Sequence, residues 1–115
     1  MQKTKMLKKN YEFRRVLSKG KRFTDHNIDV FILKNRDKSN FLGLAISTKI
    51  GKAVVRNKIK RLIRENYKNI EMKIKDGYSM VFLVKSKQKL QRKDVDFYKI
   101  KESIEKIFDK AQILK

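Results

Sequence analysis

The stretch from Lys49 to Ile70 combines residue types and spacing that suit the binding of phosphate groups. Its apolar residues recur at the interval of a buried helical stripe, namely Val55, Ile59, Leu62, Ile63 and Ile70. At about 100° per residue, the opposite arc of the same helix carries Arg56, Asn57, Lys60, Arg61, Arg64 and Lys68. The nearest acid, Glu65, lies at the edge of this arc. Because like charges on one face repel each other, the arc predicts a polyanionic partner.

The arginines of this arc differ in kind from the lysines that dominate the chain. A guanidinium presents a rigid fork of donors, so Arg56, Arg61 and Arg64 favour bidentate contacts to phosphates or base edges. Asn57 is a poorer helix former than lysine, which indicates a hydrogen bond to a nucleotide or a cap on a neighbouring loop. A charged face that meets only solvent would be expected to mix acids with its bases.

Aromatic residues offer a second candidate surface. Phe13 lies in a predicted helix and Phe31 in a predicted strand, and both could lie over the small residues Gly43, Ala45 and Ser47 of another strand. Aromatic rings beside cations bind single-stranded nucleic acid by stacking on its bases. Periodicity alone favours the simpler interpretation that both rings belong to the core. RNA is favoured over DNA because no helix-turn-helix, zinc-finger or zipper pattern is present.

Self-contained catalysis has little support in the residue pattern. His26 is the only histidine, and no second general acid or base is spaced with it. No metalloprotease motif, Cys/His ligand spacing or Gly-rich phosphate loop occurs. The acids are scattered along the chain, so the sequence predicts no catalytic residues, although the fold could still assemble an acidic cluster.

Composition limits the class of protein. The 115 residues predict a single domain over 1–115, and the 32 Lys and Arg against 12 Asp and Glu give a net charge of +20. Such an excess favours nucleic acid as the partner, with an anionic membrane surface second. The longest apolar run, Met80 to Val84, is far shorter than the roughly 20 residues of a spanning helix. The absence of Cys excludes disulfides and agrees with the cytoplasmic location that we expect.

Helical and strand patterns alternate along the chain. The first nine residues are expected to form a flexible basic arm. Helices are predicted from Asn10, as the N-cap, to the stop at Gly20, from about Lys52 to Lys68, and from Val95 to Leu114. Strands are predicted at Ile28 to Lys34, Phe41 to Ser47 and Tyr78 to Lys85, with a short one near Lys21 to Thr24. The strands at 28–34 and 41–47 are expected to pair as a hairpin, and the apolar strand at 78–85 to be central.

The chain resembles the protein subunit of bacterial ribonuclease P. The resemblance rests on a Lys-x-Gly-x-Ala-Val lead followed by an Arg-Asn-x-x-Lys-Arg-x-x-Arg helix, carried here by Lys49, Gly51, Ala53, Val54, Arg56, Asn57, Lys60, Arg61 and Arg64. It extends to the opening at Leu7–Phe13, the turn at Gly20, the strand at 43–47 and the closing helix. Lys58 and Lys85 depart from the family pattern, in which Arg is frequent at both positions, and Leu17 stands where Phe is frequent. The Pro that usually follows just after Lys85 is also missing.

This resemblance implies an α+β fold, a two-layer α/β sandwich of α-β-β-β-α-β-α order similar to a ribosomal-protein domain, with a left-handed crossover. Sequence reasoning alone predicts a right-handed one. It also implies an accessory role in an endoribonuclease that removes the 5′ leader of precursor tRNA. The catalytic RNA would carry the chemistry with RNA-bound Mg²⁺, and metal binding by the protein itself stays undefined.

Site residues follow from the same resemblance. Contacts to the catalytic RNA are implied for Lys49, Arg56, Asn57, Lys60, Arg61 and Arg64. A cleft for the single-stranded leader of precursor tRNA is implied for Phe13, Leu17, Phe31 and Lys85. Two alternatives stay open. A general or ribosomal RNA-binding protein would not distinguish precursor from mature tRNA, and a metal-dependent nuclease would cleave RNA without an RNA subunit.

Overall fold

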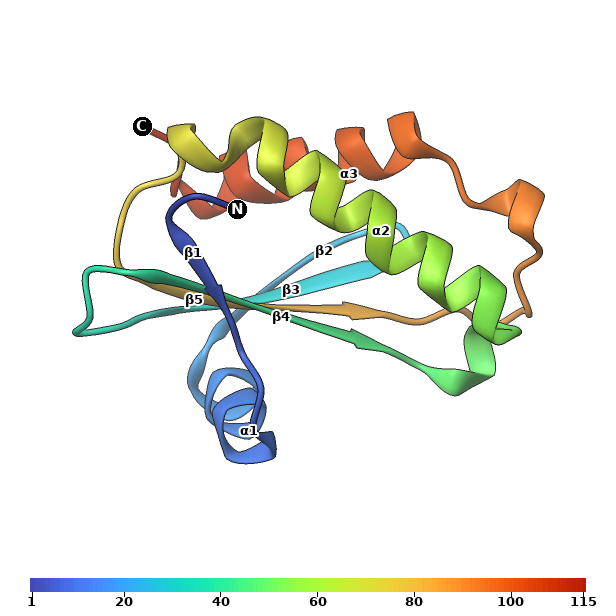
Figure 1. The fold of residues 1–115 in the computed structure, drawn as a ribbon, viewed down its shortest axis with the longest axis horizontal. Coiled ribbons are helices and arrows are strands. Elements are labelled where there is room, and N and C mark those ends of the chain that lie inside the picture. The colour runs from blue at the N-terminus through green and yellow to red at the C-terminus, as the bar shows by residue number, and fades with distance from the viewer.

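A computed structural model describes all residues from 1 to 115 and shows one five-stranded sheet with helices on both of its faces (Figure 1). The elements are β1 (Thr4–Met6), α1 (Asn10–Lys19), β2 (Lys21–Asp25), β3 (Ile28–Lys34), β4 (Asn40–Ile46), α2 (Ala53–Ile70), β5 (Tyr78–Val84) and α3 (Phe97–Ala111). Short 3₁₀ turns lie at Thr48–Ile50, Glu71–Lys73 and Arg92–Asp94. The expected α-β-β-β-α-β-α order is confirmed, and β1 precedes it.

A hydrogen bond stabilises each end of helix α1. Its N-cap position is Lys9, not the predicted Asn10, and the Glu12 carboxylate accepts the Lys9 N–H at 3.0 Å. At the other end, Gly20 donates its N–H to the carbonyl of Val16 at 2.8 Å. A Cβ at Gly20 would lie only 2.5 Å from that carbonyl oxygen, so the predicted stop at Gly20 has a steric reason.

The strand order is β1-β4-β5-β3-β2, which places β5 at the centre as predicted. The predicted hairpin of β3 with β4 is wrong, because β5 lies between them, antiparallel to β3 and parallel to β4. The physical reason is burial: β5 is apolar on both faces and is the strand that gains most from having neighbours on both sides. The connection between β3 and β4 therefore passes the end of β5, which lies between them.

The crossover from β4 to β5 passes through α2. In Figure 1 both strands point to the right and α2 lies above them, while β1, the neighbour of β4, is in front. The chain thus turns over the sheet as it moves from the nearer β4 to the farther β5, which is a left-handed connection. Nearly all such connections in proteins are right-handed. The handedness implied by the family resemblance is the one observed.

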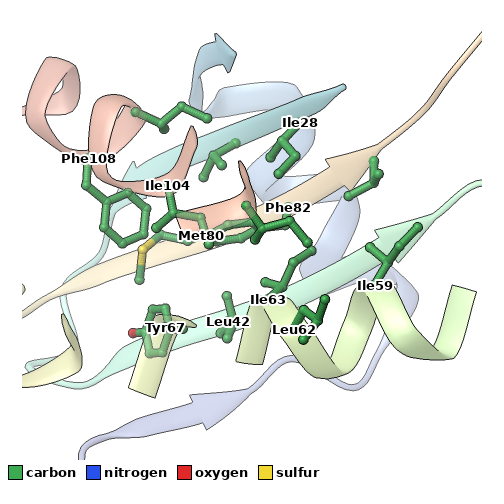
Figure 2. Packing of buried hydrophobic residues seen from close by; sticks show 14 of the residues in the cluster. Ile28, Leu42, Ile59, Leu62, Ile63, Tyr67, Met80, Phe82, Ile104 and Phe108 are labelled. Carbon is green, nitrogen blue, oxygen red and sulfur yellow. The ribbon is translucent and has the colours of Figure 1, made fainter. Parts of the chain in front are cut away.

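Two apolar layers hold the helices on the sheet. Between the sheet and helices α2 and α3, Figure 2 shows Met80 and Phe82 of β5 beside Ile63 of α2 and Phe108 of α3. The rings of Phe82 and Phe108 meet edge to face, 6.0 Å between centroids. On the opposite face, α1 packs through Val16 onto Val81 of the same central strand. Helix α1 is thereby separated from the other two helices by the thickness of the sheet (Figure 1).

The basic arm expected at residues 1–9 instead contains ordered structure. Strand β1 pairs with β4 in parallel, and Leu7 is buried. The buried carboxylate of Glu71 accepts the N–H groups of Gln2 at 2.9 Å and Lys3 at 3.3 Å. Helical and strand periodicity cannot signal so short a strand. Its stability comes from the edge of β4 and from an acid almost seventy positions away.

A hydroxyl pair completes this attachment of the N-terminal segment. The Tyr67 hydroxyl lies 2.8 Å from the Thr4 hydroxyl, and burial raises the pKa of Tyr67 to about 12. Burial alone would raise the pKa of Glu71 as well, but hydrogen bonds from Thr4, Gln2 and Lys3 leave it below its usual value. Glu71 therefore stays ionised at neutral pH and binds the start of the chain as an anion.

Replacing Glu71 by glutamine is expected to destabilise the fold in a pH-dependent way. Because the folded-state pKa of Glu71 is lowered, its contribution to stability is present above the unfolded value of 4.5 and is lost as the pH falls through the folded value. We expect Glu71→Gln to lose roughly 1 kcal/mol at pH 7. Urea denaturation between pH 7 and pH 3 should show the two stabilities converging below about pH 4.5. A constant difference, or the same behaviour in the exposed control Glu105→Gln, would contradict this assignment.

Candidate nucleic-acid interface

The basic arc of α2 faces away from the core. The predicted stripe of Val55, Ile59, Leu62 and Ile63 is buried, whereas Ile70 is only half-buried. On the opposite side, Asn57, Arg61, Arg64 and Lys68 are exposed, and Arg56 and Lys60 are half-buried. The structure thus brings the predicted helical residues onto one accessible face.

The cations of this arc have few partners within the protein. The Nε of Arg56 is buried and makes no hydrogen bond. The Nε of Arg61 lies 3.9 Å from the Glu65 carboxylate, which is too long for a hydrogen bond. Such an exposed pair contributes little to stability, so the Arg61 guanidinium can turn to another anion. The arc presents donors without acceptors, as a surface that binds phosphates would.

Lys49 is exposed in the 3₁₀ turn Thr48–Ile50, which precedes α2. The Ser47 hydroxyl accepts the Lys49 N–H at 3.2 Å, and Leu90 donates its N–H to the carbonyl of Ile50 at 2.7 Å. A Cβ at Gly51 would lie 2.8 Å from the carbonyl oxygen of Leu90. Two backbone segments therefore approach closely at Gly51, which explains the glycine before α2.

Lys58 does not join the arc. Its ammonium donates to the carbonyl of Arg92 at 2.9 Å and so attaches α2 to the 3₁₀ turn Arg92–Asp94. Lys58, which departs from the family pattern, therefore has a structural role in this chain. At positions 56 to 58, where the family pattern is Arg-Asn-Arg, only Arg56 and Asn57 belong to the basic arc.

The face of the sheet that carries α1 forms the second candidate surface. Phe13 lies over Gly43, where an added Cβ would come within 2.6 Å of the ring. Leu17, Phe31 and Ala45 pack in the same cluster and are half-buried. Phe13 therefore covers Gly43 as expected, whereas Phe31 does not lie over the small residues of β4, because Val81 of β5 stands between it and Gly43 in the register. Each ring is both packed and partly accessible. We call this surface, formed by Phe13, Leu17, Phe31 and Ala45, the α1 cleft.

Lys85 follows β5 at the edge of the α1 cleft. Its ammonium lies 3.3 Å from Oδ2 of Asp29, and Arg22 reaches the same oxygen at 3.2 Å. Burial raises the pKa of Asp29, but a hydrogen bond from Thr24 and the charges of Lys85 and Arg22 leave it below its usual value. Sequence reasoning named neither Asp29 nor Arg22 as a site residue. The available signal was the alternation of β3, which places Asp29 on the same face as Phe31.

The two surfaces lie on opposite faces of the sheet, one of which carries α1 and the other α2 (Figure 1). Strands β4 and β5 end at the right of Figure 1, where the 3₁₀ turn Thr48–Ile50 leads into the start of α2. Lys85 also lies at this edge, directly after β5. Lys49, in the turn after β4, and Lys85, after β5, therefore both follow strands that end at this edge.

The residues around the single histidine do not form a nucleophilic relay. The Ser103 hydroxyl donates to Asp25 at 2.7 Å, and His26 lies 3.7 Å from the same carboxylate oxygen. The acid lies between the other two side chains, so the imidazole is not placed to take the proton of the hydroxyl. No group of three or more His, Cys, Asp or Glu side chains is arranged to hold a metal ion. No helix of the structure has the length and apolarity needed to span a bilayer.

Known proteins resemble this chain along nearly its whole length. The family model described as Ribonuclease P matches residues 1–112. The chain is 39% identical over 112 residues to a ribonuclease P protein component of Clostridioides difficile, covering 96% of this chain and 95% of the relative. It is 43% identical over 114 residues to the component of Dictyoglomus turgidum, covering 98% and 93%.

Solved structures agree with the sequence comparisons. The RNase P protein of Staphylococcus aureus superposes with a TM-score of 0.83 at 31% identity, covering 96% of this chain and 97% of that one. The protein from Thermotoga maritima superposes with a TM-score of 0.80 at 26% identity, covering 92% and 96%. The sheet, the three helices and their order are shared with these proteins.

Proposed function

This chain belongs to the ribonuclease P protein family, and from that premise we propose that it is the accessory subunit of a ribonucleoprotein that removes the 5′ leader from precursor tRNA. The RNA subunit carries the cleavage chemistry in this proposal. The protein binds that RNA with one surface and the leader with another.

The observation that carries the proposal is the unpartnered basic arc of α2. Its side chains, with Lys49 at the preceding turn, form the contact with the catalytic RNA in our proposal; they are Lys49, Arg56, Asn57, Lys60, Arg61 and Arg64. Each phosphate that they neutralise releases condensed counterions, so binding to the RNA should weaken steeply with salt. The weak pairing of Arg61 within the protein supports this role, because RNA phosphates would supply acceptors for its exposed donors.

The leader of precursor tRNA lies in the α1 cleft in this proposal. Phe13 and Phe31 offer ring surfaces to its bases, Leu17 adds apolar contact, and Lys85 meets its phosphates. Stacking on rings tolerates any base, which suits a strand whose sequence differs among precursors. Mature tRNA lacks this strand, so the α1 cleft would contribute to the distinction between substrate and product.

Mg²⁺ is assigned to the RNA subunit. The chain offers no group of three or more acidic, His or Cys side chains that could hold a metal ion, so its own residues do not fit a catalytic metal centre. The protein would act by binding and positioning RNA.

Cleavage of a labelled precursor tRNA at low Mg²⁺ tests the proposal. The assay compares this protein alone, a bacterial ribonuclease P RNA alone, and both together. We expect efficient cleavage only when both are present, with a 5′ phosphate on the mature product. Cleavage by the protein alone would favour a self-contained nuclease. A protein that binds RNA without stimulating cleavage would be a general RNA-binding module.

A further inference from the structure

Asp29 is a buried carboxylate on the face of the sheet that carries α1, with Thr24 as its register partner on β2. Its neighbours on that face include Phe31 on the same strand and Leu83, which is its register partner on β5. The Asp29 side chain is only 3% exposed. Burying a carboxylate is costly, and an apolar residue of similar size would often be as stable or more so. Its presence here calls for a role other than stability.

The two cations that contact Asp29 lie closer to solvent than Asp29 does. Arg22 on β2 and Lys85 after β5 both reach the same Oδ2 atom, at 3.2 and 3.3 Å, from opposite sides of β3. The Arg22 side chain is 53% exposed and the Lys85 side chain 58% exposed. A strand of RNA approaching the sheet would therefore meet two cations before it met the acid. Without Asp29, the two cations would repel one another and move apart.

These cations border the aromatic part of the α1 cleft. Arg22 is the register partner of Phe31, one of the two rings of the α1 cleft. A nucleotide whose base stacked on Phe31 would bring its phosphates near the Arg22 guanidinium. A guanidinium fork matches the geometry of phosphate oxygens, and the chain as a whole carries a charge of +20.

We propose that Arg22 and Lys85, held by Asp29, form a phosphate-binding site for the single-stranded leader. Arg22 contacts the RNA, and Asp29 is a positioning residue that fixes both cations beside the α1 cleft. This inference rests on the proposed function and adds a second cation and its anchor to the leader-binding surface. Asp29 also limits the net charge of the site to that of one cation, so that binding depends on geometry as well as on charge.

The test measures binding of precursor tRNA with a ten-nucleotide leader, and of mature tRNA, to the assembled ribonucleoprotein. The variants are Arg22→Gln, Asp29→Asn and the double variant. Arg36→Gln, at the exposed turn between β3 and β4, removes the same charge from the far end of the strands and is the matched control. Phe13→Ala is the reference variant for the α1 cleft and should weaken binding of precursor but not of mature tRNA.

We expect Arg22→Gln to weaken precursor binding about fivefold, to leave mature tRNA unaffected, and to reduce the salt dependence by the equivalent of about one phosphate contact. In the Asp29→Asn background the same substitution should cost less than about twofold, because Arg22 is no longer held in place. Asp29→Asn alone should lower the preference for precursor over mature tRNA. A shallower dependence of the logarithm of the precursor binding constant on the logarithm of the salt concentration would not follow from a purely structural defect.

Several results would overturn the inference. They are an effect of Arg22→Gln equal to that of Arg36→Gln, equal losses for precursor and mature tRNA, or an undiminished cost of Arg22→Gln in the Asp29→Asn background. If Asp29→Asn does not fold, Arg22→Gln and Lys85→Gln decide the matter, because both alter only half-exposed side chains. If the native protein shows no preference for precursor, or Phe13→Ala has no effect, the proposed leader cleft itself fails.

Discussion

Replacing Arg61 and Arg64 together by alanine is expected to weaken binding of this protein to the catalytic RNA by roughly 30- to 150-fold. Both side chains are exposed on the basic arc of α2, and neither is held by a strong contact within the protein. Each charge-assisted contact to phosphate is worth about 1 to 1.5 kcal/mol, so two lost contacts give a change of about 2 to 3 kcal/mol in the free energy of binding. Filter binding or fluorescence titration at fixed salt would measure it.

The control for this prediction is Lys101→Ala with Lys110→Ala on α3. It removes the same charge from exposed helical positions outside the proposed contact. We expect a change of less than about threefold, since only long-range attraction is reduced. Similar losses in both double variants would mean that net charge, and not the arc, determines binding. Stability of the Arg61 and Arg64 variant should stay within about 0.5 kcal/mol of the native chain, and unfolding would instead make these residues structural.

Replacing Phe82 by alanine is expected to produce the largest loss of stability. Phe82 is fully buried on the central strand and meets the ring of Phe108 edge to face. Removing a buried phenyl ring costs about 3 to 5 kcal/mol, against about 5 to 15 kcal/mol for the whole stability of a small domain. Urea denaturation would show a lower midpoint with an unchanged slope.

Tyr11→Ala is the matched control for the loss of an aromatic ring. The Tyr11 residue is 63% exposed on α1, so its removal should change stability by no more than about 0.5 kcal/mol. A Phe82→Ala variant that lost less than about 1 kcal/mol would mean that the layer between the sheet and α3 can close around the missing ring.

The amphipathic helices were predictable because their signal is local. The apolar stripe of α2 repeats within a few residues, and the predicted range of about Lys52 to Lys68 differs little from the observed Ala53–Ile70. Once the helix forms, its periodicity places these side chains on the same face, independently of the tertiary structure. The basic arc could therefore be assigned from spacing alone. Lys58 lies outside this arc by its spacing, and only the tertiary structure shows that it contacts Arg92.

Strand pairing was not predictable in the same way. The turn between β3 and β4 has the composition of a hairpin connection, yet β5 separates the two strands. Which strands lie beside β5 depends on the total area that the sheet and its helices bury together, and that quantity involves helices far along the chain. Strand β1 shows the same dependence, because its partner β4 and the acid Glu71 lie far from it in sequence.

By itself, the sequence determined the basic arc, the central strand, the size of the two faces of β4 and the family resemblance. Each of these is carried by neighbouring residues. The tertiary structure alone decided that Arg22, Asp29 and Lys85 meet, because they come from three segments that only the register of the sheet aligns. It also decided that the α1 cleft and the basic arc lie on opposite faces of the sheet. Pairing and crossover are set by burial summed over the whole fold, and no local pattern contains that sum.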